Sequence, residues 1–278
     1  MLKKTTVMKV SVITVCYNAE FGIEKTILSV LNQTYSDIEY IMIDGASTDG
    51  TIDIIHKYAD KISYLVSEPD GGIYDAMNKG IKIATGEWIN FLNAGDTFYY
   101  STSIENAFSH DVLPEIDVLY GYQVHNYEYG KFVRKRLPLT FFNLGMPFGH
   151  ESSFVRAEVM KRIGFDTNFR IAADYNFFFK LYVSGNKFQP VDAIVTDFES
   201  MEGVSSSANT TLLTHRETSM VNGSYASAQY VKGLLVLYVR VILKKLLPKS
   251  VVIKRQCRQR EQNEEYIPLS VFLASHHA

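Results

Sequence analysis

Four segments of the chain place acidic, amide and hydroxyl side chains directly after short apolar runs. Carboxylate and amide oxygens can hold a divalent cation or accept a hydrogen bond from a nucleobase, and glycines let the backbone approach a phosphate closely. Ligands of open parallel sheets bind at the carboxyl ends of the strands, so we expect these segments to converge on one site. The segments are CYN (16–18), DGASTDG (44–50), SEPDGGIYD (67–75) and NAGD (93–96).

Two common phosphate-binding motifs are excluded by the same segments. GASTDGT has two glycines spaced as in a phosphate loop, but Thr51 stands where the lysine is required. No GxGxxG follows the first apolar run, which argues against an ordinary dinucleotide-binding domain. Taken alone, DGASTDG is equally consistent with a strand-to-helix turn in which Ser47 or Thr48 caps a helix.

The apolar runs that precede these segments predict strands of a parallel sheet. Each is continuous, as expected for a strand covered on both faces, and helical periodicity fills the gaps between them. The pattern predicts an α/β fold built from consecutive βαβ units. The predicted strands span residues 10–15, 39–43, 62–67 and 87–92.

Beyond residue 100 the alternation weakens, and the elements expected there differ. We expect a hairpin, a strand, a helix from about Asp174 to Gly185, two short strand-like runs ending at Phe198, and a loop. An apolar helix interrupted by basic residues follows; it is short for a membrane span and typical of an interfacial amphipathic helix. We expect the hairpin over residues 121–136, the strand over 149–155, the loop over 203–211 and the final helix over 233–248.

Composition places the chain among ordinary globular proteins and makes nucleic acid an unexpected partner. The 278 residues carry a net charge of −2, but residues 232–278 hold nine basic and three acidic side chains. Two cysteines make neither a disulfide framework nor a metal site, which favours a reducing compartment, the cytoplasm. The N-terminal segment has too short an apolar run for a signal peptide and is interpreted as the approach to the first strand.

Together, the four loops resemble those of family 2 inverting glycosyltransferases of the GT-A type. The resemblance rests on VSVITVCYNAE, IMIDGASTDGT, SEPDGGIYDAMNKGIKIATGEWINFLNAGD, GHESSFV and FRIAADYNFFFKLY, and covers about residues 9–200. Within the family the chain is similar to the WcaE-like enzymes of bacterial exopolysaccharide and O-antigen assembly. The resemblance implies a catalytic domain over 1–205, with a nucleotide-sugar half (9–100) and an acceptor half (101–205), and a basic helical extension over 206–278.

The resemblance implies a donor site for a nucleotide sugar, expected to be UDP-linked. Asp44 would accept a hydrogen bond from uracil N3, and Lys79 would lie near the diphosphate. Glu68, Asp70 and Asp75 could suggest the acid and nucleophile of a glycosidase, but the nucleotide-type loops around them favour donor-sugar binding, with Asp70 as the chosen residue. The remaining donor-site residues implied are Thr14, Tyr17, Asn18, Asn93 and Ala94.

The resemblance also implies a base and a metal. Asp174 corresponds to the carboxylate that deprotonates the acceptor hydroxyl, with Ala173 where a second acid is common. NAGD occupies the position of the family's DxD motif but retains only Asp96, which with diphosphate oxygens could hold Mg²⁺ or Mn²⁺. His150 could be a second ligand or contact the diphosphate, and its alternative is a structural histidine.

Two alternatives for the function and two for the basic extension remain open from the sequence. The depleted metal motif is consistent with a non-catalytic, membrane-surface assembly protein that keeps the fold. A nucleotidyltransferase is less consistent, because a basic, glycine-rich triphosphate loop is missing. The basic extension could bind the anionic inner face of the cell membrane, where a lipid-linked glycan acceptor would lie, or could pack against the catalytic domain or another subunit.

Overall fold

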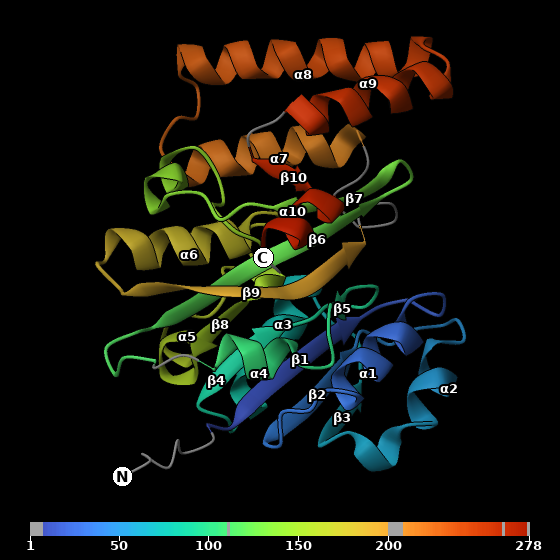
Figure 1. The fold of residues 1–278 in the computed structure, drawn as a ribbon, viewed down its shortest axis with the longest axis vertical. Coiled ribbons are helices and arrows are strands. Elements are labelled where there is room, and N and C mark those ends of the chain that lie inside the picture. Colours follow the sequence, from blue (N-terminus) through green and yellow to red (C-terminus); the bar gives the residue numbers. More distant parts are fainter. Residues whose placement is uncertain (1–7, 110–111, 200–207, 263–264, 277–278) are drawn as a thin grey trace.

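The computed structural model describes residues 8–109, 112–199, 208–262 and 265–276. Across these residues, a ten-stranded mixed sheet runs through the molecule with helices on both faces (Figure 1). The strand order along the main path is β10-β7-β6-β8-β4-β1-β2-β3. The predicted α/β class is therefore confirmed, with a sheet that is parallel in its N-terminal half and mixed beyond it.

The N-terminal half contains the four predicted parallel strands. They lie in the order β4-β1-β2-β3, so their carboxyl ends share one edge of the sheet. Each ends within two residues of its expected limits, because buried β-branched runs specify strands locally. The strands are β1 (Val10–Cys16), β2 (Ile38–Asp44), β3 (Tyr64–Ser67) and β4 (Trp88–Phe91).

The second half of the sheet contains the predicted hairpin, formed by β6 (Val118–Tyr127) and β7 (Gly130–Arg134). The expected strand over 149–155 is shorter: residues His150–Ser152 form the 3-10 turn η3, and β8 (Ser153–Arg156) then pairs antiparallel with β4. The two expected runs before Phe198 are instead one strand, β9 (Phe188–Glu199), because pairing with β6 continues through register shifts. Strand β5 (Thr97–Phe98) pairs with β9.

Alternating side chains of the parallel strands pack into two separate cores. Ile13 and Val15 face one core, with residues of α3 and α6, while Val10 and Val12 face the other. A Cβ atom on Gly80 would lie 2.5 Å from Ile13 Cγ2, so helix α3 lies very close to β1. One face carries α3 (Ile73–Ile83), α5 (Ala157–Ile163) and α6 (Ala173–Val183); the other carries α1 (Ile23–Leu31), α2 (Thr51–His56) and α4 (Ser103–Ala107). Two further 3-10 turns are η1 (Ala59–Lys61) and η2 (Leu139–Asn143).

The C-terminal region is helical, as expected, and returns to the sheet. Helix α8 begins after Ser227, whose side chain caps it by accepting the Tyr230 N–H. Helices α8 and α9 lie at one end of the molecule, away from α1 and α2 (Figure 1). Strand β10 pairs antiparallel with β7. The elements are α7 (Ala208–Val221), α8 (Ala228–Leu246), α9 (Lys249–Gln262), β10 (Tyr266–Pro268) and α10 (Leu269–His276).

The loop expected over 203–211 is wrong in its second part. Residues 208–211 are the first turn of α7, and residues 203–207, like the expected domain boundary at 205, lie outside the described residues. The Thr- and Asn-rich turn has low intrinsic helix propensity, but α7 packs against α6 and α8, and tertiary packing overrides propensity. No helix within the described ranges is both long and apolar enough to cross a membrane.

Candidate active site

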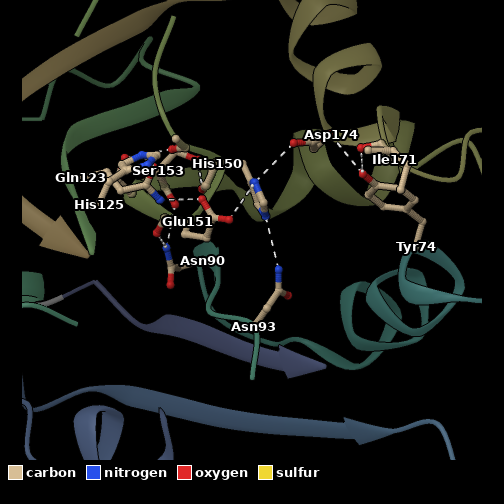
Figure 2. Close-up of polar contacts among 12 residues, drawn as sticks. Tyr74, Asn90, Asn93, Gln123, His125, His150, Glu151, Ser153, Ile171 and Asp174 are labelled. Carbon is tan, nitrogen blue, oxygen red and sulfur yellow. Dashed lines mark hydrogen bonds and ion pairs between the residues drawn. The ribbon is translucent and has the colours of Figure 1, made fainter. Parts of the chain in front are cut away.

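The centre of the candidate site is His150, which faces two carboxylates (Figure 2). Its Nδ1 lies 3.2 Å from Glu151 Oε1 and 3.3 Å from Asp174 Oδ2. On the opposite side of the ring, Nε2 lies 3.5 Å from the Asn93 amide nitrogen. The turn η3, helix α6 and the loop after β4 thus bring three of the sequence-predicted residues together: Asn93, His150 and Asp174.

Asp174 is fixed in place by both its helix and the loop before it. It is the second residue of α6, and its Oδ1 lies 3.1 Å from the buried hydroxyl of Tyr74, which also lies 2.6 Å from the Ile171 carbonyl oxygen. The carboxylate of Glu217, a buried residue of α7, accepts the three backbone N–H groups of residues 170–172 at 2.9–3.0 Å. Helix α7 therefore holds the loop that orients Asp174.

The charges of the pair stabilise each other. Burial alone would lower the pKa of His150, but the negative charges of Glu151 and Asp174 outweigh burial and raise that pKa to about 9. Burial would raise the pKa of Asp174, but the hydrogen bond and charge of His150 hold it below its usual value. At neutral pH the site therefore contains an imidazolium and an ionised aspartate.

Glu151 is a site residue that the sequence reasoning missed. It is buried, and its second carboxylate oxygen accepts a 2.7 Å hydrogen bond from Gln123 Nε2. Gln123 Oε1 in turn lies 3.0 Å from Nε2 of the buried His125 (Figure 2). The signal for Glu151 was an acidic side chain in a segment expected to form a strand, directly after His150, because a buried carboxylate requires partners.

The loop after β4 carries the remaining metal-binding candidates. Asp96 is buried, and its charge contributes to the raised pKa of His150. Asn93 Oδ1 is buried without a hydrogen-bond partner among the described residues, and the Ala94 backbone N–H donates to Val15 O. A carboxylate and an amide oxygen on one loop fit a hard cation such as Mg²⁺ or Mn²⁺. His150 would have to lose its proton before it could act as a metal ligand.

Within the described residues, no group of three or more histidine, cysteine, aspartate or glutamate side chains is arranged to hold a metal ion. Substrate phosphates would therefore have to complete the coordination of a cation at Asp96 and Asn93.

Two of the expected donor-site residues lie in the interior of the structure. Thr14 is fully buried, and its hydroxyl donates to the Leu92 carbonyl oxygen at 2.8 Å. Asp44 is also fully buried; its Oδ2 accepts from Ser47 N (2.9 Å) and Ser67 Oγ (2.6 Å), and its Oδ1 accepts from Ser47 Oγ. Both carboxylate oxygens of Asp44 are thus engaged in holding the loop between β2 and α2.

The other expected donor-site residues lie nearer the surface. Tyr17 is 64% exposed at the end of β1. Asn18 has a positive φ of 49°, and its side-chain oxygen accepts the Thr48 N–H at 2.8 Å. Lys79 Nζ contacts Glu68 at 2.8 Å and donates to Pro69 O at 2.9 Å, so in this structure it braces the loop that carries Asp70.

Comparison with known proteins identifies the domain. Residues 11–178 match the Glycosyl transferase family 2 domain. The chain is 34% identical over 181 residues to an uncharacterized glycosyltransferase of Mycobacterium tuberculosis, covering 62% of this chain and 68% of that protein. It is 33% identical over 159 residues to a PGL/p-HBAD biosynthesis glycosyltransferase of Mycobacterium bovis, covering 54% of this chain and 60% of that protein.

Solved structures support the same fold. The S. aureus protein TarS in complex with UDP-GlcNAc superimposes with a TM-score of 0.60 at 22% identity, covering 83% of this chain and 72% of that chain. The Pyrobaculum calidifontis mannosyltransferase PcManGT in complex with GDP-Man and Mn²⁺ gives a TM-score of 0.62 at 17% identity, covering 94% and 82%. These likenesses concern the fold and confirm the expected GT-A type. The chain belongs to glycosyl transferase family 2.

Proposed function

We propose that this glycosyltransferase moves a sugar from a UDP-linked donor to a hydroxyl of a bacterial, lipid-linked glycan, with inversion at the anomeric carbon. The observation that carries the proposal is the position of the Asp174 carboxylate, 3.3 Å from His150 at the edge where the parallel strands end, an arrangement that lowers the pKa of Asp174 and raises that of His150. The acceptor would belong to exopolysaccharide or O-antigen assembly, as in the WcaE-like enzymes.

In the proposed reaction, Asp174 acts as the general base. The acceptor oxygen attacks the anomeric carbon, its proton passes to the Asp174 carboxylate, and the bond from that carbon to the diphosphate oxygen breaks on the opposite side. One displacement inverts the centre. The lowered pKa keeps Asp174 ionised, and Glu217 and Tyr74 hold it in one orientation.

Negative charge accumulates on the leaving UDP, and this chain offers positive charge near it. The His150 imidazolium lies beside Asn93 on the loop after β4, where the diphosphate would bind. Oxygens of Asp96 and Asn93 would hold Mg²⁺ or Mn²⁺, which supplies further charge stabilisation when bound.

The test is nucleotide release by the purified protein from UDP-, GDP- and dTDP-sugars, with and without Mn²⁺. We expect release from a UDP-sugar, and Asp174→Asn should reduce it by about 10²–10⁴-fold while UDP affinity stays nearly constant. Asp53→Asn, at an exposed position of α2, is the matched control. Unchanged release by Asp174→Asn would refute the base assignment. Neither binding nor release of any donor would instead favour a non-catalytic assembly protein.

We also propose that helices α8 and α9 dock on an anionic membrane surface, where a lipid-linked acceptor lies. An exposed apolar stripe runs along α8 at helical spacing, and no acidic residue occurs from 232 to 260, so a second copy would be repelled by like charge. The same two helices carry exposed cations, Lys232 and Arg240 on α8 and Lys254, Arg255 and Arg258 on α9. The stripe comprises Val231, Leu235, Tyr238, Ile242 and Leu246.

This docking is tested by sedimentation with phosphatidylglycerol vesicles. The full chain should co-sediment, salt should weaken binding, and the double variant Leu235→Glu with Ile242→Glu should lose most of it. Val271→Glu, at an exposed apolar position on α10, is the control. Equal binding by the double variant would refute the membrane surface.

A further inference from the structure

Asp70 occupies space that a side chain at position 45 would otherwise fill. A Cβ atom on Gly45 would lie 2.6 Å from Asp70 Oδ2 and 3.4 Å from Tyr17 Cδ2. Gly45 directly follows Asp44, at the carboxyl end of β2. The absence of a side chain there lets a carboxylate from the loop after β3 occupy the space over Gly45, which the exposed ring of Tyr17 also borders.

The loop that carries Asp70 is held in place by several contacts. Asp70 Oδ1 accepts the Gly72 N–H at 2.8 Å, and Asp75 accepts the Gly71 N–H at 2.9 Å. Lys79 ties Glu68 and the Pro69 carbonyl to helix α3. Asp70 Oδ2 receives no hydrogen bond from the residues that the structure describes, so one oriented acceptor remains over Gly45, near the Tyr17 ring.

Asp44, the residue expected to bind the base, offers no comparable acceptor. It is fully buried, and its two oxygens already accept hydrogen bonds from Ser47 and Ser67. A base N–H could reach the buried Asp44 only by displacing one of these bonds, and the lost bond would offset the one gained.

We propose that Asp70, rather than Asp44, reads the nucleobase, and that Oδ2 accepts the imide N–H of a uracil ring stacked on Tyr17. The inference rests on the proposed nucleotide-sugar function and names its base-determining residue. Guanine presents two adjacent N–H donors that suit both oxygens of a carboxylate, but here Oδ1 is already bound to Gly72. Cytosine has no proton at N3 and would place an acceptor against Oδ2.

The experiment compares UDP and CDP binding by calorimetry in the full chain and in Asp70→Asn. Asparagine keeps an oxygen for the Gly72 N–H and turns its NH₂ toward the base, where it repels the uracil N–H and donates to cytosine N3. The parent protein should prefer UDP by about tenfold or more, and Asp70→Asn should lose at least about tenfold in UDP affinity and shift the UDP/CDP ratio toward CDP. A merely structural role would weaken both nucleotides equally.

A second variant tests the same geometry from the other side. Gly45→Ala places a methyl group against Asp70 Oδ2 and should weaken UDP binding without favouring CDP. Asp53→Asn should leave both affinities unchanged. An unaltered UDP/CDP ratio in folded Asp70→Asn, with UDP still bound, would overturn the base assignment alone. Failure of the parent protein to bind any nucleotide would overturn it together with the proposed function.

Discussion

The parallel strands carry a network of charged side chains at each end, and the two networks are built differently. At the amino end, Glu39 accepts hydrogen bonds from Ser11 Oγ, Thr85 N (2.7 Å) and Thr85 Oγ1 (2.6 Å), and it lies 3.4 Å from Lys9 Nζ. At the carboxyl end, His150 stands between Glu151 and Asp174, near Asn93, whose buried Oδ1 has no partner among the described residues.

Shifted pKa values occur at both ends, so they do not by themselves identify the active site. Burial would raise the pKa of Glu39, but the hydrogen bonds from Ser11 and Thr85 lower it to about 2. The hydrogen bonds that the Glu39 carboxylate accepts from Ser11 and Thr85 link β2 to β1 and to the turn at Thr85. In the carboxyl-end network, Asn93 Oδ1 is still able to accept a hydrogen bond, and the His150 imidazolium lies at the sheet edge where the loops converge. A substrate can use groups arranged in this way.

The largest expected contrast is in catalysis. His150→Gln keeps a hydrogen-bonding side chain but removes the positive charge beside Asp174, so kcat for sugar transfer should fall about 100-fold. Glu39→Gln, in protein that remains folded, should change kcat by less than about twofold. Steady-state rates at saturating donor measure both variants.

Two results would contradict a catalytic role confined to the carboxyl-end network: equal loss of activity in both variants, or parent-like turnover by His150→Gln. The first result would mean that both networks act through folding. The second would leave Asp174 without a charge partner in the reaction.

Most elements of the fold could be predicted because their determinants are local. The runs that form β1 and β2 are mostly apolar and largely buried, and α3 carries its own helical periodicity. The family resemblance already assigned both His150 and Asp174 to the site. The residues that hold Asp174 in place could not be predicted. Glu217 binds backbone groups 45–47 residues earlier in the chain, and such long-range pairing leaves no periodic signal in the sequence.

The close approach of Asp70 to Gly45 could not be predicted from the sequence for the same reason. A glycine after Asp44 reads as part of an ordinary turn, and a carboxylate in SEPDGG reads as loop polarity. The two residues meet only because β2 and β3 lie side by side, which places the loops after these strands against each other. Local patterns therefore identify which loops form the site, whereas the side chain that serves each role depends on tertiary contacts.

The smaller expected contrast is in stability and its pH dependence. Because the folded-state pKa of Glu39 lies below that of the unfolded chain, the ionised carboxylate stabilises the fold above about pH 5 and loses this effect as the pH falls toward 2. Glu39→Gln should therefore lower the free energy of unfolding by about 2 kcal/mol at pH 7, and its difference from the parent protein should shrink between pH 5 and pH 3.

Urea denaturation at several pH values measures this difference. Asp53→Asn, exposed on α2, serves as the control and should show little difference from the parent protein at any pH. A Glu39→Gln difference that stays constant from pH 7 to pH 3 would mean that its hydrogen-bond geometry, and not its ionisation, stabilises the amino end. The two ends of the sheet would then differ in kind, since charge would matter at the carboxyl end alone.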